Sequence, residues 1–434
     1  MSNFRTILIA IFLAFFVFAV LIFSGAINPF PDKAKDGLKG VINIWGTFPK
    51  NALSKAIDTL TTENKNLTVN YVNKEENTYQ EDLVQAFAEG KGPDLFIITP
   101  DMLIKNKNFI YKIPYASYAE KTFTNSFIDG ASIYLDKEGV WAYPLLVDPI
   151  VLYYNKDILS NEGIVYPPRT WDELFTMNAA LTKRSNSGVI SQSMIALGQY
   201  ANVNNAKEIL STLLIQNDDE IIKRKDLGYV SVLNSNPLGL SVSPIEAVLK
   251  FFIEFSNQSD SAYSWNGSLP NSLDMFTSGK LAFYIGKASE LFNIQSINPN
   301  LIFNVNQIPQ IKDATTKRTY GEIYAIAVNK KTANLAAAFK VAGDLTTGDK
   351  AKSISTSMSL PPVSRDLLNS KPNENPYLFT FFNSAIITKS WIDPDEIKTD
   401  GIFKELIENI LSNTLSLGEA VGKAQGQFEQ IIKK

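Results

Sequence analysis

Apolar positions in the first part of the globular chain alternate between two spacings. Residues 41–45 form a short apolar run, residues 67–71 alternate apolar and polar side chains, and residues 94–98 are almost wholly apolar, as β-strands are. Residues 50–63 and 80–89 instead repeat apolar side chains at the spacing of amphipathic helices. This β-α-β-α-β order predicts a parallel, doubly wound sheet with right-handed crossovers.

Ligands of such sheets bind beyond the carboxyl ends of the strands. Residues with polar or aromatic side chains follow the three predicted strands and are candidate ligand-binding residues: Trp45, Thr47, Glu75, Glu76 and Asp101. The ring of Trp45 suits either a ligand platform or packing at the end of the sheet. The sequence therefore predicts one wall of a binding cleft at this edge.

The middle of the chain is predicted to be rich in helices, and the part that follows it contains both strands and helices. Apolar spacing predicts helices near 171–184, 204–216 and 244–256, separated by clusters of Asn, Ser, Gly and Pro. Two β-rich passages, 281–285 and 320–328, precede the last helices. The length of 434 residues allows two to three domains at ~150 residues each.

A run of seventeen uncharged, apolar residues occupies positions 7–23, behind Arg5. A secretory signal core spans ~7–15 residues, whereas a membrane-spanning helix needs ~17–25. The length favours a signal anchor over residues 1–27, and the small residues at 24–26 leave a cleaved signal peptide open. Residues 28–39 are predicted to be an exposed tether, and the positive-inside rule places everything beyond them in the periplasm or at the cell surface.

Composition excludes several functional classes. The net charge of −3 gives no basic excess for a nucleic-acid surface. The chain has no histidine and no cysteine, which excludes a Ser-His-Asp triad, a Cys-His pair, thiolate metal sites and disulfides. The acidic stretch at 393–401 has Ile397 where a calcium loop needs a ligand. We therefore expect no cofactor, no metal and no catalytic residue, with a two-carboxylate glycosidase as the enzymatic alternative.

Five segments in order along the chain carry motifs: GPDLFII at 92–98, GVWAYPLLVDPIVLYYNKDIL at 139–159, PPRTWDEL at 167–174, FTSGKLAFYIG at 276–286 and LPPVS at 360–364. Each motif alone is weak evidence of a family. Together they resemble the extracellular solute-binding proteins of ABC importers, the maltose-binding-protein-like family 1.

The resemblance implies an α/β, two-lobe periplasmic-binding-protein fold of type II, in which each lobe is a doubly wound sheet flanked by helices. It also implies three hinge crossings, near 147–149, 285–288 and 334–339. The division that follows is 40–146 plus 289–333 for lobe one, and 149–285 plus 340–434 for lobe two.

Ligand contacts in the cleft follow from the same resemblance. Asp148 occupies the first hinge crossing, where members of this family often present a polar side chain to the ligand. The other segments that usually reach the cleft contribute Gln199, Tyr200, Trp265, Gly286, Tyr320 and Trp391. Polar neighbours favour a cleft role over packing for Trp265 and Trp391.

Aromatic rings flanked by Asn, Gln, Asp and Ser suit carbohydrate, whose apolar C–H faces stack and whose hydroxyls form hydrogen bonds. Arginine is scarce beside lysine, which disfavours an anionic ligand. We therefore expect a monomeric binding component that captures a sugar or oligosaccharide by hinge closure and delivers it to ABC permease subunits. The alternatives are a peptide, polyamine or other small solute as ligand, and a transporter-independent sensor as role.

Overall fold

The computed structural model describes residues 39–225, 228–236, 239, 241–370 and 375–433. The predicted signal anchor over residues 1–27 and the tether up to residue 38 lie outside the described residues. Among the helices that are described, none combines the length and the apolar character needed to cross a membrane.

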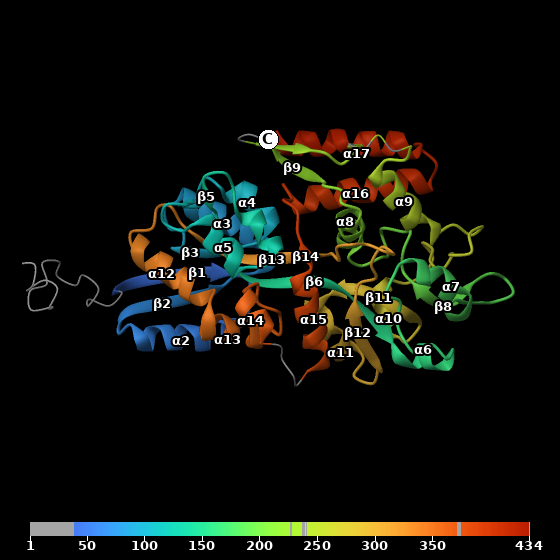
Figure 1. Ribbon diagram of the computed structural model, residues 1–434, viewed down its shortest axis with the longest axis horizontal. Helices are drawn as coiled ribbons and strands as arrows, with labels where there is room; N and C mark the ends of the chain where they lie inside the picture. The colour runs from blue at the N-terminus through green and yellow to red at the C-terminus, as the bar shows by residue number, and fades with distance from the viewer. Residues whose placement is uncertain (1–38, 226–227, 237–238, 240, 371–374, 434) are drawn as a thin grey trace, which may run out of the picture.

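A ten-stranded sheet runs through the described part of the chain in the order β2-β1-β3-β13-β6-β11-β8-β7, with β12 also paired to β6 and β14 to β13 (Figure 1). Its strands are β1 (Lys39–Gly46), β2 (Asn66–Asn73), β3 (Leu95–Ile98), β6 (Tyr143–Asn155), β7 (Lys183–Arg184), β8 (Ile190–Ile195), β11 (Leu281–Lys287), β12 (Phe303–Gln307), β13 (Thr319–Val328) and β14 (Thr388–Lys389). The first three strands are parallel, as predicted, but β13 is antiparallel to β3, so the sheet is mixed.

Strand β6 belongs to both halves of the sheet. Its residues 143–149 pair with β13, and its residues 150–155 pair with β11 and β12. We call the half around β1–β3 lobe one and the half around β8, β11 and β12 lobe two; they lie on the left and right of Figure 1. Nearly every residue of β6 is buried, which explains its almost continuous apolar run.

Helices pack around both halves of the sheet. Around lobe one lie α2 (Ser54–Glu63), α3 (Tyr79–Ala88), α4 (Pro100–Asn106), α5 (Glu120–Ser126), α12 (Leu335–Leu345), α13 (Gly348–Met358), α14 (Arg365–Asn369) and the 3-10 helix η3 (Asp129–Tyr134). Around lobe two lie α6 (Lys156–Asn161), α7 (Asp172–Leu181), α8 (Ala206–Gln216), α9 (Pro244–Glu254), α10 (Ser272–Thr277), α11 (Leu291–Ile297), α15 (Pro376–Ile386), α16 (Glu396–Leu411) and α17 (Leu417–Ile432). Two short antiparallel strand pairs, β4–β5 (Ile113–Pro114 and Gly139–Val140) and β9–β10 (Ile222–Lys225 and Gly228–Ser231), complete this outline.

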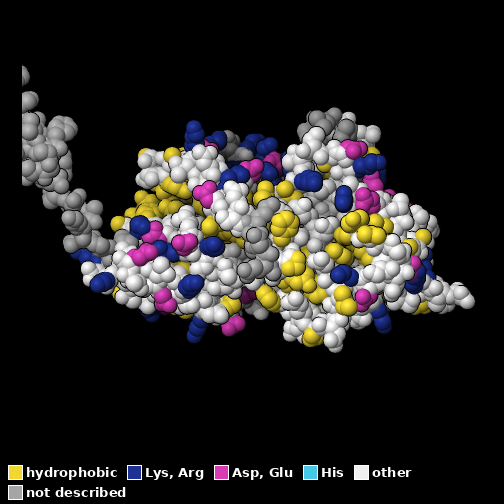
Figure 2. Space-filling view, turned by 60° about the horizontal axis from the view of Figure 1, so that its bottom comes forward, with side chains coloured by type: hydrophobic (Ala, Val, Ile, Leu, Met, Phe, Trp, Pro, Cys, Tyr) yellow, Lys and Arg dark blue, Asp and Glu magenta, His cyan; other side chains and the backbone are white. Residues whose placement is uncertain are grey.

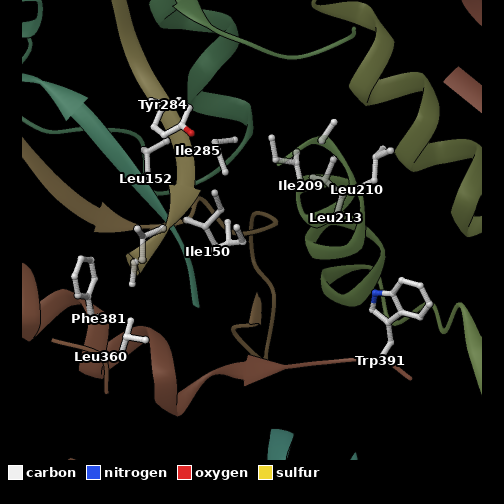
Figure 3. Close-up of a cluster of buried hydrophobic side chains, with 14 of the residues drawn as sticks. Ile150, Leu152, Ile209, Leu210, Leu213, Tyr284, Ile285, Leu360, Phe381 and Trp391 are labelled. Carbon is white, nitrogen blue, oxygen red and sulfur yellow. The ribbon is translucent and has the colours of Figure 1, made fainter. Parts of the chain in front are cut away.

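Helix α8 is held against the sheet by its apolar face. Ile209 and Leu213 of this helix are buried beside Ile150 of β6 and Ile285 of β11 (Figure 3). This packing fixes the first turn of α8 at the boundary between the lobes.

The predicted division of the chain into two lobes differs in two places from the observed strand pairing and helix packing. The sequence assigns residues 289–333 to lobe one, but β12, which falls within that range, pairs with residues 151–155 of β6 in lobe two. The sequence assigns everything after residue 340 to lobe two, but α12 and α13 pack against α2 in lobe one. Both assignments depend on contacts between distant segments, which apolar spacing does not encode.

Candidate functional site

Charged side chains from both lobes meet where the chain enters α4, α8 and α16. We call this set the cleft cluster: Asp101, Lys207, Glu208, Lys287, Tyr320, Glu322, Asp393 and Glu396. Asp101 comes from lobe one, Tyr320 and Glu322 from β13, and the others from lobe two. Figure 2 shows Lys, Arg, Asp and Glu side chains gathered at the dip between the lobes, at the top of that view.

Local structure explains how these side chains reach one place. On β13, successive residues point to opposite faces, so Tyr320 and Glu322 share the half-buried face while Gly321 between them is buried. Asn205 precedes α8 with a φ of 58°, and the turn that it makes starts the helix one residue later. The first turn of α8 therefore carries Lys207 and Glu208 to the boundary between the lobes.

Two lysines hold the carboxylates of the cluster in place. Lys287 Nζ lies 3.1 Å from Glu322 Oε2 and 3.7 Å from Glu208 Oε1. Lys207 Nζ lies 3.1 Å from Asp393 Oδ2, and both side chains are nine-tenths buried. Such buried pairs contribute little net stability, but loss of one partner leaves a charge without compensation.

Burial, together with repulsion among neighbouring carboxylates, raises the pKa of acidic groups in the cleft cluster. Burial, followed by repulsion from Glu322 and Glu396, raises the pKa of Asp101 to about 7. Burial also raises the pKa of Glu396. The charge of Glu322 raises the pKa of Lys287 well above its ordinary value, in spite of burial. Lys287 is therefore a cation at neutral pH, whereas Asp101 exchanges its proton there.

The cleft cluster has five carboxylates and two lysines, so it offers an excess of hydrogen-bond acceptors to a ligand. Its free volume is about 10 Å³, which is room for about one water molecule. Across the same gap, Lys105 Nζ of α4 lies 3.5 Å from Asp395 Oδ2, which precedes α16. A ligand larger than water therefore does not fit inside this gap as the structure has it.

Three of the residues predicted from sequence lie in or beside the cleft cluster. Asp101 and Tyr320 are members of it. Asp148 is buried next to it on β6, and its carboxylate accepts the backbone N–H of Ser289 at 3.0 Å. Burial raises the pKa of Asp148 to about 6, although the charge of Lys287 opposes the shift. The carboxylate at the predicted hinge crossing therefore accepts a hydrogen bond from the backbone of the segment that follows β11.

The other candidates of lobe one do not belong to the cleft cluster. Trp45 is half-buried at the end of β1, and Lys74 Nζ lies 4.0 Å above the centre of its ring. Thr47 is half-buried, and Glu75 and Glu76 are exposed. Part of the indole of Trp45 is therefore accessible, and the ammonium group of Lys74 lies over the ring.

Two tryptophans expected in the cleft are core residues. Trp265 is fully buried, and its Nε1–H donates to Asn202 at 3.0 Å. Trp391 is 7% exposed, and its Nε1–H donates to Ser211 of α8 at 3.1 Å. Neighbouring polar residues satisfy the indole N–H from within the protein. The prediction of a ligand platform is wrong for Trp265, which has no exposed face.

The remaining three candidates also lie outside the cleft cluster. Gly286 pairs with Val151 inside the sheet. Tyr200 is buried, and its hydroxyl donates to Asp400 Oδ1 of α16 at 2.6 Å. Gln199 is half-buried one residue earlier.

Sequence reasoning missed most of the lobe two half of the cluster. Lys207 and Glu208 follow β8 and open α8, so the rule used for lobe one, that ligands lie beyond strand ends, also points to them. Asp393 and Glu396 flank the start of α16, where acidic residues are common as helix caps. Only the fold reveals that these two helix starts face Asp101.

Comparison with known protein families identifies the family of this chain. A family model described as bacterial extracellular solute-binding protein matches residues 55–380, which is most of the chain.

Solved structures of similar fold include carbohydrate-binding proteins. A cyclo/maltodextrin-binding protein complexed with maltotetraose has a TM-score of 0.73 at 17% identity, over 92% of this chain and 99% of the other. A cyclic alpha-maltosyl-1,6-maltose binding protein from Arthrobacter globiformis has a TM-score of 0.75 at 14% identity, over 91% and 99%. The maltose/maltodextrin-binding domain from Bdellovibrio bacteriovorus bound to maltotriose has a TM-score of 0.65 at 17% identity, over 91% and 100%. At these identities the likeness concerns the fold.

Proposed function

The chain belongs to the bacterial extracellular solute-binding proteins, and on that premise we propose that it is the extracytoplasmic binding component of an ABC importer. Its fold is then a two-lobe periplasmic-binding fold of type II. The ligand is a sugar or oligosaccharide, held between the lobes at the cleft cluster and handed to permease subunits. The observation that carries this proposal is the convergence of charged and polar side chains from both lobes on one gap.

The chemistry of the cleft cluster suits sugar hydroxyls. Each hydroxyl can donate to a carboxylate such as Glu208 and accept from a lysine such as Lys287. Tyr320 adds a ring beside these groups. The carbohydrates in the similar solved structures support the same ligand class.

Capture requires movement of the lobes. The free volume of about 10 Å³ at the cleft cluster is far too small for a sugar ring. Binding therefore begins in a more open form, and the ligand favours the closed form by its differential affinity for it. Residues 7–23 would tether the protein to the cytoplasmic membrane, and the binding component works as a monomer.

A cationic solute such as a polyamine is the second candidate. The excess of carboxylates over lysines in the cleft cluster favours it, because an ammonium group would compensate the unpaired negative charge.

Titration calorimetry with maltotetraose, mannotriose and spermidine tests the proposal. We expect heat of binding with a sugar and a weakening of roughly ten- to a hundredfold in Glu208→Gln, the effect of one lost hydrogen bond to a charged group. Glu81→Gln, an exposed carboxylate on α3, is the control and should bind as wild type does. Binding of spermidine alone would favour the second candidate, and the absence of heat with both sugars would overturn the ligand class.

A further inference from the structure

Asp101 is the carboxylate that lobe one contributes to the cleft cluster. It lies in the first turn of α4 and accepts a hydrogen bond from the hydroxyl of Thr99 beside it. Helices α4 and α16 lie on opposite sides of the dip at the top of Figure 1. The charged and titratable groups around Asp101 come from several elements: Lys207 and Glu208 of α8, Lys287 of β11, Tyr320 and Glu322 of β13, Asp393 and Glu396 at the start of α16, Tyr134 of η3, and Lys105 one turn along α4.

The cations near Asp101 are paired with other carboxylates. Both lysines of the cleft cluster have partners there, as described above. Lys105 pairs with Asp395 across the gap. Within the described part of the chain, Asp101 therefore takes part in no ion pair. Four carboxylates of the cluster face it and only two lysines do, so closure of the lobes places Asp101 in a region of net negative charge.

A carboxylate in such a place is more stable as the neutral acid. Burial, followed by the charges of Glu322, Glu396 and Asp393, raises the pKa of Asp101 to about 7 in this arrangement. When the lobes separate, Asp393 and Glu396 move away with lobe two and water reaches Asp101. Its pKa should then return towards the ordinary value of 3.8.

Few other side chains change charge near neutral pH, because the chain has no histidine. Burial raises the pKa of Asp148 to about 6 and that of Asp219 to about 7. Asp148 lies on β6, and Asp219 lies between α8 and β9, outside the cleft cluster. The gap itself is therefore expected to respond to pH through Asp101.

We propose that Asp101 is a proton switch for the lobes: the closed form holds a proton at this carboxylate, facing the carboxylates of lobe two, and the open form releases it. Ligand-free protein then closes in mild acid and opens as the pH rises. The ratio of closed to open molecules should fall by about tenfold between pH 6 and pH 8.5, because the closed form holds the proton more tightly. The proposal rests on the proposed function for the movement of the lobes, but not on the choice of ligand.

The distance between two labels, one on each lobe, tests the switch. The chain has no cysteine, so two introduced cysteines carry spin labels without a background. Lys107→Cys, directly after α4, and Lys404→Cys, on the exposed side of α16, provide the two positions. In pulsed electron paramagnetic resonance on the ligand-free protein, we expect a larger fraction of long distances at pH 8.5 than at pH 6.

Three further substitutions in this labelled chain identify the responsible group. Asp101→Asn carries no charge at either pH, so its distances should be the short ones at both. Asp219→Asn is the matched control, because Asp219 has a similar pKa but lies outside the cleft cluster, and it should respond to pH as the parent does. Glu396→Gln removes one of the repelling charges and should reduce the response.

Saturating maltotetraose and mannotriose separate this proposal from the proposed function. If a sugar shortens the distance at pH 8.5 but pH alone does not change it, the proton switch is overturned and the proposed function stands. A response to pH that persists undiminished in Asp101→Asn would also overturn the switch. If pH changes the distance in the parent and not in Asp101→Asn, while neither sugar changes it, the switch stands and the carbohydrate assignment fails.

Discussion

Lys287 Nζ lies 3.1 Å from Glu322 Oε2 and joins the last residue of β11 to the middle of β13, where the two lobes meet. The same ammonium group lies 3.7 Å from Glu208 Oε1 of α8. One cation therefore compensates two carboxylates that would otherwise repel each other in a poorly solvated place.

Replacing this lysine should destabilise the protein severely. Lys287→Met leaves Glu322 and Glu208 without their cation, and breaking a buried pair in this way costs about 3–5 kcal/mol of the free energy of unfolding. Urea denaturation measures the loss. The double variant Lys287→Met, Glu322→Gln should recover part of it, because one stranded charge is then removed.

The control for this prediction is a pair on the surface. Lys404 Nζ lies 4.0 Å from Glu408 on the exposed side of α16. Lys404→Met should change the free energy of unfolding by less than ~1 kcal/mol, as exposed pairs do. Equal losses in Lys287→Met and Lys404→Met would contradict the role given to Lys287.

The protonation of Asp101 should make stability depend on pH. Its pKa of about 7 in the folded protein exceeds the ordinary value of 3.8, so the folded chain holds this proton more tightly than the unfolded chain. The stability that this proton gives is fully present below pH 3.8 and is lost as the pH rises through 7.

Asp101→Asn imitates the protonated form and should remove this dependence. We expect the melting temperature of the variant to approach that of wild type at pH 4 and to exceed it increasingly towards pH 8. Asp58→Asn, an exposed carboxylate on α2, serves as control and should follow the wild-type pH profile. A constant difference between Asp101→Asn and wild type over this pH range would disprove the assignment.

The sequence predicted the strands of lobe one and the polar residues that follow them, because strand spacing and strand ends are local properties. Asp101 could be found in this way, and Tyr320 from the family resemblance. Glu208 and Asp393 could not be paired with Asp101, since only the packing of α8 and α16 brings them to the same gap. Trp265 could not be recognised as a core residue from the sequence, because Asn202, which is distant along the chain, accepts the hydrogen bond from its indole N–H inside the core.

Tryptophan substitutions should separate binding from packing. Trp265→Ala removes a fully buried ring, so we expect a loss of about 3–5 kcal/mol in the free energy of unfolding. Trp45→Ala removes a half-buried ring near the end of β1. If Trp45 is a sugar platform, ligand affinity should fall by about 2–4 kcal/mol, as for a binding hot spot.

Calorimetry on the folded variants decides between these roles. Trp45→Ala should keep near wild-type urea stability and lose affinity for maltotetraose or mannotriose. If Trp45→Ala binds the sugar with wild-type affinity, Trp45 is a packing residue at the end of β1 and not a ligand platform.

Closure of the lobes should depend on the pair between Lys105 and Asp395, whose charged atoms lie 3.5 Å apart across the gap. This contact forms only when α4 and the start of α16 approach each other, so it stabilises the closed form and hence ligand binding. Lys105→Met should weaken ligand affinity by a factor of about two to five, the contribution of a partly exposed ion pair.

Lys398→Met is the matched control for this prediction. Lys398 also pairs with Asp395, at 2.8 Å, but it lies in the same segment of lobe two. We expect Lys398→Met to bind as wild type does, and small-angle scattering at saturating ligand should show compaction in both variants. Equal affinities for Lys105→Met and Lys398→Met would show that the contact between the lobes does not contribute to closure.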